Sequence, residues 1–176
     1  DWVFDPSTGE FARRRLRRRP EISVVVAPIA RAAWGLFAPF HYMSAELHHS
    51  ARCWGLWAEG RLAAFAGFLF RPGGRVPIMG VSRVVTLPDF QGIGLAFVLL
   101  EAAASAYRAV GFRVNHYPAH PLFIRACDRS PAWKLVRKSG LFSHVNTGRT
   151  QGTGRMGGRP CAVFEYVGPA MERLEA

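Results

Sequence analysis

The chain has 176 residues, of which 49% are hydrophobic and 20% are charged, which is enough for one folded domain with tails. This composition excludes a disordered or collagen-like protein, and no run approaches the roughly 18 apolar residues of a membrane-spanning helix. The net charge of +11 comes mostly from arginine and favours a nucleic-acid partner, although a solvated cationic surface explains the same count.

The first part of the chain, residues 1–20, is predicted to form a basic arm. It begins Asp1-Trp2-Val3, without the basic-then-apolar order of a signal peptide, so we expect a cytoplasmic protein. Residues 13–19 contain six arginines, whose mutual repulsion favours an extended segment over a packed helix. The three cysteines lack the paired spacing of a zinc or redox motif, which agrees with a reducing compartment.

Residues 21–168 are predicted to form a single domain, and residues 169–176 a C-terminal tail. Apolar runs predict strands at 22–29, 51–59, 61–70, 78–87, 112–116, 133–138 and 161–167, and the first of these runs is rich in β-branched residues. Helical spacing predicts helices at 30–37, 94–110 and 121–128. Between these elements we expect a tight turn at Glu59-Gly60, a loop from 41 to 44 that leads into a short helix, and a glycine-rich loop at 147–159. This order of elements predicts an α/β (α+β) fold with a mixed sheet.

The segment from Val84 to Ala96 is the most informative motif, because a strand leads there through a glycine-bearing turn into the long helix. Such a junction presents free N–H groups at a helix N-terminus, where a pyrophosphate can bind. Gly92 and Gly94 allow a ligand to approach the main chain closely. The segment lacks the Gly-Lys-Ser/Thr of a phosphate-binding loop and the spacing of a dinucleotide fingerprint, which excludes both classes of nucleotide enzyme.

Gln91, Gly94 and Ala96 fill the pattern Gln/Arg-x-x-Gly-x-Gly/Ala, and on this motif the chain resembles the GNAT superfamily of acyl-coenzyme A transferases. The resemblance covers about residues 22–167. It implies a largely antiparallel mixed sheet flanked by helices, and acetyl-CoA or a related acyl-CoA as cosubstrate. It also implies that the strand residues Val84, Val85 and Thr86 pair with the pantetheine arm. The turn residues Gln91, Gly92, Ile93, Gly94, Leu95 and Ala96 would take the pyrophosphate.

The usual catalytic residues of that superfamily are missing from this sequence. No carboxylate lies between Met79 and Leu87, and no tyrosine lies between Pro121 and Phe142. We therefore look for the reacting groups among polar residues beside the motif. The candidates are His41, Tyr42, Ser44, Arg83 and His116.

Four of the five candidate catalytic residues have an expected role. Tyr42 would donate a proton to the leaving thiolate, and His41 would deprotonate the acceptor. Arg83 lies in an apolar strand, so it should face a cleft, a phosphate or a structural carboxylate. His116, at the end of a strand, would be a base with a pKa near neutrality, although a hydrogen-bonded structural histidine is equally consistent with that position.

The strings His-Tyr-x-Ser, Ser-Arg and Gln-x-x-Gly also resemble the phage-associated GNAT branch that includes the Mom proteins, which modify adenine in DNA. This resemblance implies DNA as the partner, held through arginine contacts to phosphate. The residues expected to make those contacts are Arg13, Arg14, Arg15, Arg17, Arg18, Arg19, Arg149 and Arg155. It also implies an iron site at His41, His48 and His49 with Glu46, for which solvated surface histidines are the alternative.

Three functions therefore stay open at the level of sequence. The first is an acyl-CoA-dependent enzyme that modifies a base in nucleic acid. The second is a GNAT enzyme that acetylates a small amine or a protein. The third is a nucleic-acid-binding module that keeps the fold without catalysis.

Overall fold

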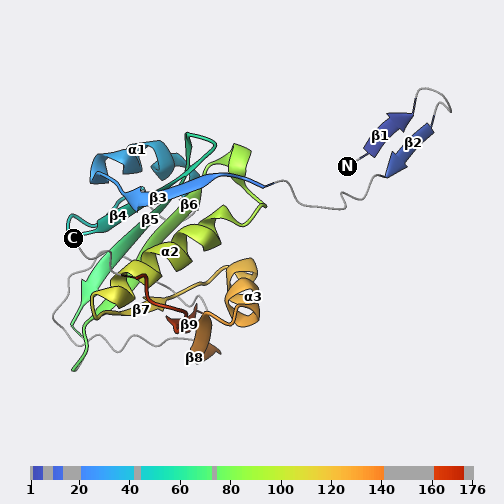
Figure 1. Ribbon diagram of the computed structural model, residues 1–176. Coiled ribbons are helices and arrows are strands. Elements are labelled where there is room, and N and C mark those ends of the chain that lie inside the picture. The colour runs from blue at the N-terminus through green and yellow to red at the C-terminus, as the bar shows by residue number, and fades with distance from the viewer. Residues whose placement is uncertain are drawn as a thin grey trace.

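The computed structural model describes residues 2–5, 10–13, 21–41, 45–72, 75–140 and 161–172 (Figure 1). Its main feature is a seven-stranded sheet with the order β3-β4-β5-β6-β7-β9-β8. The strands are β3 (Val24–Pro28), β4 (Arg52–Ala58), β5 (Arg61–Arg71), β6 (Ile78–Thr86), β7 (Arg113–His116), β8 (Trp133–Gly140) and β9 (Cys161–Tyr166). Among the described strands, only β6 and β7 are parallel neighbours, which confirms the predicted mixed and largely antiparallel sheet.

Two predicted helices form nearly as expected, as α2 (Leu95–Ala109) and α3 (Pro121–Arg129). The predicted helix at 30–37 is instead divided among η1 (Arg31–Ala33), α1 (Trp34–Phe37) and η2 (Ala38–Phe40). The helical backbone continues through Pro39, because proline is tolerated in the first turn of the 3₁₀ helix η2. The short helix expected after residue 44 is wrong for 45–50, which the structure describes as non-helical.

The tight turn predicted at Glu59-Gly60 joins β4 to β5. Both residues have positive φ, 48° at Glu59 and 75° at Gly60. This backbone conformation belongs to the hairpin turns whose twist matches that of the flanking strands. The prediction of a hairpin is therefore confirmed.

The N-terminal segment contains a pairing that the sequence did not predict. β1 (Trp2–Asp5) and β2 (Glu10–Arg13) form an antiparallel two-stranded sheet with Trp2 opposite Arg13. The expected arm is therefore extended at Arg13, but as part of a paired strand. The other arginines of the arm lie outside the described residues.

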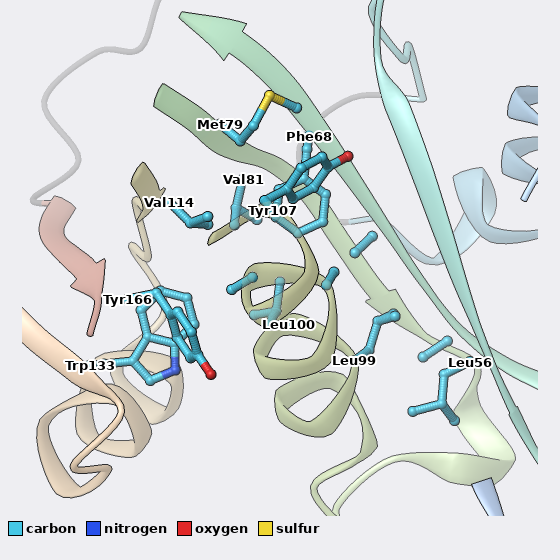
Figure 2. Packing of buried hydrophobic residues seen from close by; sticks show 14 of the residues in the cluster. Leu56, Phe68, Met79, Val81, Leu99, Leu100, Tyr107, Val114, Trp133 and Tyr166 are labelled. Atoms are coloured by element: carbon cyan, nitrogen blue, oxygen red, sulfur yellow. The ribbon is translucent and has the colours of Figure 1, made fainter. Parts of the chain in front are cut away.

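The core consists of two clusters of buried side chains, one on each face of the sheet. On one face α2 packs with Leu99, Leu100 and Tyr107 against the strands (Figure 2). On the other face α1 contributes Trp34 and Phe37, which pack on Phe65 of β5. Each such side chain contributes roughly 1.5–3 kcal/mol of hydrophobic stabilisation. This double packing fixes the strand–turn–helix junction between β6 and α2.

Within the described ranges, no helix has both the length and the apolar character needed to cross a bilayer. Cys53 and Cys127 are buried free thiols, as expected, and Cys161 is half-buried. Burial raises the pKa of Cys127 to about 12.

Candidate functional site

The parallel strands β6 and β7 lie side by side only at their first residues. Pairing between them ends at Gly80 and Asn115, although β6 continues to Thr86. In the described part of the chain, the β7-facing edge of β6 beyond Gly80 has no strand partner. Such an edge presents backbone N–H and C=O groups that an extended ligand can pair with, as an added strand would. The predicted residues Val84, Val85 and Thr86 lie on this edge.

A β-bulge in β6 lies beside the divergence. Gly67 of β5 pairs with Arg83, whereas the next residue, Phe68, pairs with Val81, which leaves Ser82 as the extra residue. A bulge changes the direction in which the following side chains point. Beyond it, Val84 packs on the α2 side of the sheet and Val85 on the α1 side.

The turn from β6 to α2 is closed by one side chain, since Gln91 Nε2 donates a hydrogen bond to the carbonyl oxygen of Thr86 at 3.0 Å. Gly92 and Gly94 follow with φ of 81° and 91°, in the left-handed region that favours glycine. A β carbon built at either glycine would have no atom within 4 Å, so the space beside both is open. Leu95 is buried in the core, so of this residue only the backbone N–H is available to a ligand.

The N-terminus of α2 is suited to an anion. Gly94 is its N-cap and offers no side chain to the helix, and the first turn contains no acidic residue. The first N–H groups of a helix have no partner within the helix and carry a partial positive charge. An open, glycine-lined helix start without a competing carboxylate fits the pyrophosphate of an acyl-CoA.

His116 lies at the end of β7, where the two strands have separated. Its ring centroid is 5.6 Å from that of Phe123 and 6.0 Å from that of Trp133. Neither ring nitrogen has a hydrogen-bond partner among the described residues. Burial lowers the pKa of His116 to about 3, because these apolar surroundings disfavour the charged imidazolium. The expectation of a base with a pKa near neutrality is therefore wrong, and His116 is a neutral donor and acceptor of hydrogen bonds.

Arg83 connects β6 to the segment that follows the first helix. Its guanidinium donates hydrogen bonds to the carbonyl oxygens of Ser82 at 2.9 Å and Glu46 at 3.0 Å. Trp34 Nε1 holds the same segment by donating to the carbonyl oxygen of Ala45 at 2.6 Å. The contact with Arg83 places the backbone of Glu46 beside β6, whereas of the loop from 41 to 44 the structure describes only His41. The contacts described for Arg83 are with backbone carbonyls, so they make it an anchor for the segment.

Of the three remaining catalytic candidates, the structure describes only His41. Tyr42 and Ser44 lie outside the described residues. His41 is half-buried, and its ring meets Trp34 edge-on at 5.6 Å between centroids. The structure therefore brings His41 to the α1 side of the sheet, and its predicted role as a base stays a prediction.

The candidate iron site is not assembled. The rings of His48 and His49 stack at 4.3 Å, and His48 Nδ1 lies 2.8 Å from Ser50 Oγ. Among the described residues, which include His41 and Glu46, no three histidine, cysteine or carboxylate groups gather as metal ligands. The arginines predicted to bind DNA, Arg149 and Arg155 included, lie outside the described residues except for the backbone of Arg13.

Sequence reasoning missed Arg71 as a site residue. Its side chain crosses the face of Gly80, and its guanidinium carbon lies 5.1 Å from the centroid of the Tyr117 ring. A β carbon at Gly80 would lie 2.7 Å from Arg71 Nε, so this crossing requires glycine. A glycine inside a strand often marks such a close approach, and Gly80 was the available signal.

Comparison with known proteins gives the family. The family model described as "Acetyltransferase (GNAT) family" matches residues 19–127. No curated protein matches the chain in sequence. The fold is similar to a Bacillus subtilis acetyltransferase solved in complex with CoA, with a TM-score of 0.58, 10% identity, and 83% of this chain and 98% of that one covered.

Two further structures are similar at the level of fold. Arabidopsis thaliana NAA60 in complex with acetyl-CoA has a TM-score of 0.57 and 14% identity, over 82% of this chain and 98% of that one. The ribosomal-protein-S18-alanine N-acetyltransferase of Escherichia coli has a TM-score of 0.53 and 15% identity, over 86% and 97%. At these identities the likeness concerns the fold alone.

Proposed function

We propose that this chain, which belongs to the acetyltransferase (GNAT) family, transfers an acetyl group from acetyl-CoA to an amine of a small molecule or a protein. In this reaction the amine nitrogen forms a bond to the thioester carbonyl carbon, and the carbon–sulfur bond breaks. The amine loses one proton and the leaving thiolate gains one, so the products are an acetamide and free coenzyme A.

The observation that carries the proposal is the junction between the diverging strand β6 and the N-terminus of α2. The unpaired edge of β6 at Val84–Thr86 would pair with the pantetheine amides. The N–H groups after Gly94 would bind the pyrophosphate, in the open space that a β carbon would otherwise enter. Both groups belong to the backbone, so coenzyme binding does not depend on the missing carboxylate and tyrosine.

His116 supports the same proposal from the other strand. As a buried neutral imidazole, it carries one N–H group that can donate a hydrogen bond, and neither ring nitrogen has a partner among the described residues. A donor in a site with little water stabilises the negative charge that develops on a carbonyl oxygen or a leaving thiolate. We assign His116 this role in place of general base.

Calorimetric titration of the full chain with acetyl-CoA tests the proposal directly. The wild type should bind, and Gly94→Trp should abolish binding while the circular dichroism spectrum stays close to that of the wild type. The wild type should also release coenzyme A when acetyl-CoA and an amine acceptor are both present. Unchanged affinity in Gly94→Trp would remove the main support for coenzyme binding at this turn.

A second candidate acceptor is nucleic acid, in particular an adenine base in DNA as in the Mom-type reaction. The observation that favours it is the net charge of +11, which suits a phosphate backbone. Mass spectrometry of nucleosides from cells that express the chain would detect a modified base. Salt-dependent DNA binding without any modified base would instead favour the non-catalytic module.

A further inference from the structure

Arg71 lies on the sheet face opposite α2, beside Gly80 and the ring of Tyr117. It lies on the same face of β5 as Phe65, which packs on α1, because side chains alternate along a strand. Its side chain passes over Gly80, and its guanidinium carbon lies over the Tyr117 ring, 5.1 Å from the centroid. Gly80 pairs with Asn115 at the last position before β6 and β7 separate. The Arg71 guanidinium therefore lies beside Gly80, the last residue of β6 that pairs with β7.

Asn115 lies on this same face, since its partner Gly80 and its second neighbour Tyr117 both face Arg71. The Asn115 side chain is only 8% exposed, and its Oδ1 has no hydrogen-bond partner among the described residues. A buried carbonyl oxygen without a donor is costly, so it marks a position where a ligand N–H is favoured. The face thus combines a hydrogen-bond acceptor with a nearby cation.

The two faces of the divergence would receive different substrates. The helix α2, whose N-terminus fits the pyrophosphate, packs on one face, together with His116 and its neighbour Trp133. An acyl-CoA held by that helix start approaches from the α2 face. The opposite face, with Arg71 and Asn115, is then the side from which the amine reaches the thioester.

Two arginines on this face, Arg113 and Arg71, differ in whether they have a carboxylate partner among the described residues. Glu165, which pairs with Asn115 across β7 and β9, already accepts a hydrogen bond from Arg113 Nε at 2.9 Å. Within the described residues, no salt bridge involves Arg71. A guanidinium that lies over an aromatic ring can still donate its N–H groups to a carboxylate or a phosphate, and its positive charge repels a second ammonium group.

We propose that Arg71 and Asn115 form the acceptor site, and that Arg71 selects amines that carry a carboxylate or phosphate group. Asn115 Oδ1 would accept a hydrogen bond from the amine, and Arg71 would bind the anionic group. This inference rests on the proposed acetyl transfer and adds the chemical class of its acceptor.

Paired acceptors that differ in one group test the inference. With the full chain and saturating acetyl-CoA, initial rates of coenzyme A release are compared for 2-aminoethyl phosphate against 2-aminoethanol, and for β-alanine against propylamine. We expect kcat/KM to be about tenfold higher or more for each anionic amine, as for hydrogen bonds between charged groups. The two pairs distinguish phosphate from carboxylate. Putrescine, a diamine, should be the poorest acceptor.

Variants separate this inference from the proposed function. Arg71→Gln should abolish the preference for anionic amines without changing the affinity for acetyl-CoA, and Arg71→Lys should keep part of it. The control is Arg52→Gln, at an exposed arginine of β4, which should keep the full preference. Calorimetric binding of each amine to the coenzyme A complex gives the same comparison without turnover.

Equal use or equal binding of neutral and anionic amines, with acetyl-CoA still bound, would overturn the inference and leave the proposed function standing. A preference that Arg71→Gln and Arg52→Gln reduce equally would also overturn it. Failure of the wild type to bind acetyl-CoA would instead contradict the proposed function.

Discussion

Asn115 and His116 follow one another in β7, and their side chains lie on opposite faces of the sheet, each with buried atoms that lack a hydrogen-bond partner among the described residues. A buried polar atom without a partner costs about 1–3 kcal/mol. Both residues lie where β6 and β7 separate, so a ligand in the divergence can meet one polar atom on each face.

Stability should fall in acid because of His116. Its pKa is about 3 in the folded chain, against 6.5 for an ordinary histidine, so between these values the unfolded chain binds the extra proton. As the pH decreases from about 6.5 towards 4, the free energy of unfolding should drop by up to about 1.4 kcal/mol per pH unit from this group. Denaturant titrations of the wild type and His116→Phe at several pH values check this. An identical pH dependence in the two proteins would contradict it.

Two glycines with the same backbone conformation should respond differently when they are replaced by alanine. Gly94 and Gly111 have φ of 91° and 88°, and a β carbon at either enters open space. Each substitution should cost about 1–2 kcal/mol of stability from the left-handed backbone. Only Gly94→Ala should also weaken acetyl-CoA binding, by about tenfold or more, because its β carbon lies beside the anion-binding N–H groups. Calorimetry and thermal unfolding measure the two effects, and equal affinity in both variants would argue against the turn as the site.

Arg83→Met should destabilise the fold, because Arg83 holds a backbone carbonyl group of the segment that follows the first helix. The substitution removes two charge-assisted hydrogen bonds, including the one to Glu46. We expect a loss of about 1.5–3 kcal/mol, measured by denaturant unfolding. Arg52→Met, at an exposed arginine, is the matched control and should change stability by about 0.5 kcal/mol or less. Equal stability of the two variants would show that Arg83 does not anchor the segment.

Deletion of residues 13–19 tests whether the arm contacts nucleic acid. If DNA binds, the logarithm of affinity should fall linearly with the logarithm of salt concentration, by about 0.9 for each phosphate contacted. Removal of the six arginines should flatten this slope. Fluorescence anisotropy with a labelled duplex at several salt concentrations measures it. The same slope in both proteins would mean that the arm makes no phosphate contact.

The sequence by itself predicted the order of the strands and helices and the strand–turn–helix junction. These depend on local chemistry: alternating apolar residues specify strands, Gly111 closes α2, and Gly92 and Gly94 permit positive φ in the turn. Such signals act over a few residues and can be read in order along the chain. They sufficed to predict the sheet, both longer helices and the strand–turn–helix junction.

Only the tertiary structure decided which polar groups meet at the divergence. The approach of Arg71 to Tyr117 depends on the pairing of β5, β6 and β7. The pKa of His116 depends on its burial, to which Phe123 of α3 and Trp133 of β8 contribute. Burial and electrostatics are set by such long-range neighbours, so the pattern around a single histidine could not give its charge state. For the same reason the sequence could not show that the Arg83 guanidinium donates a hydrogen bond to the carbonyl oxygen of Glu46.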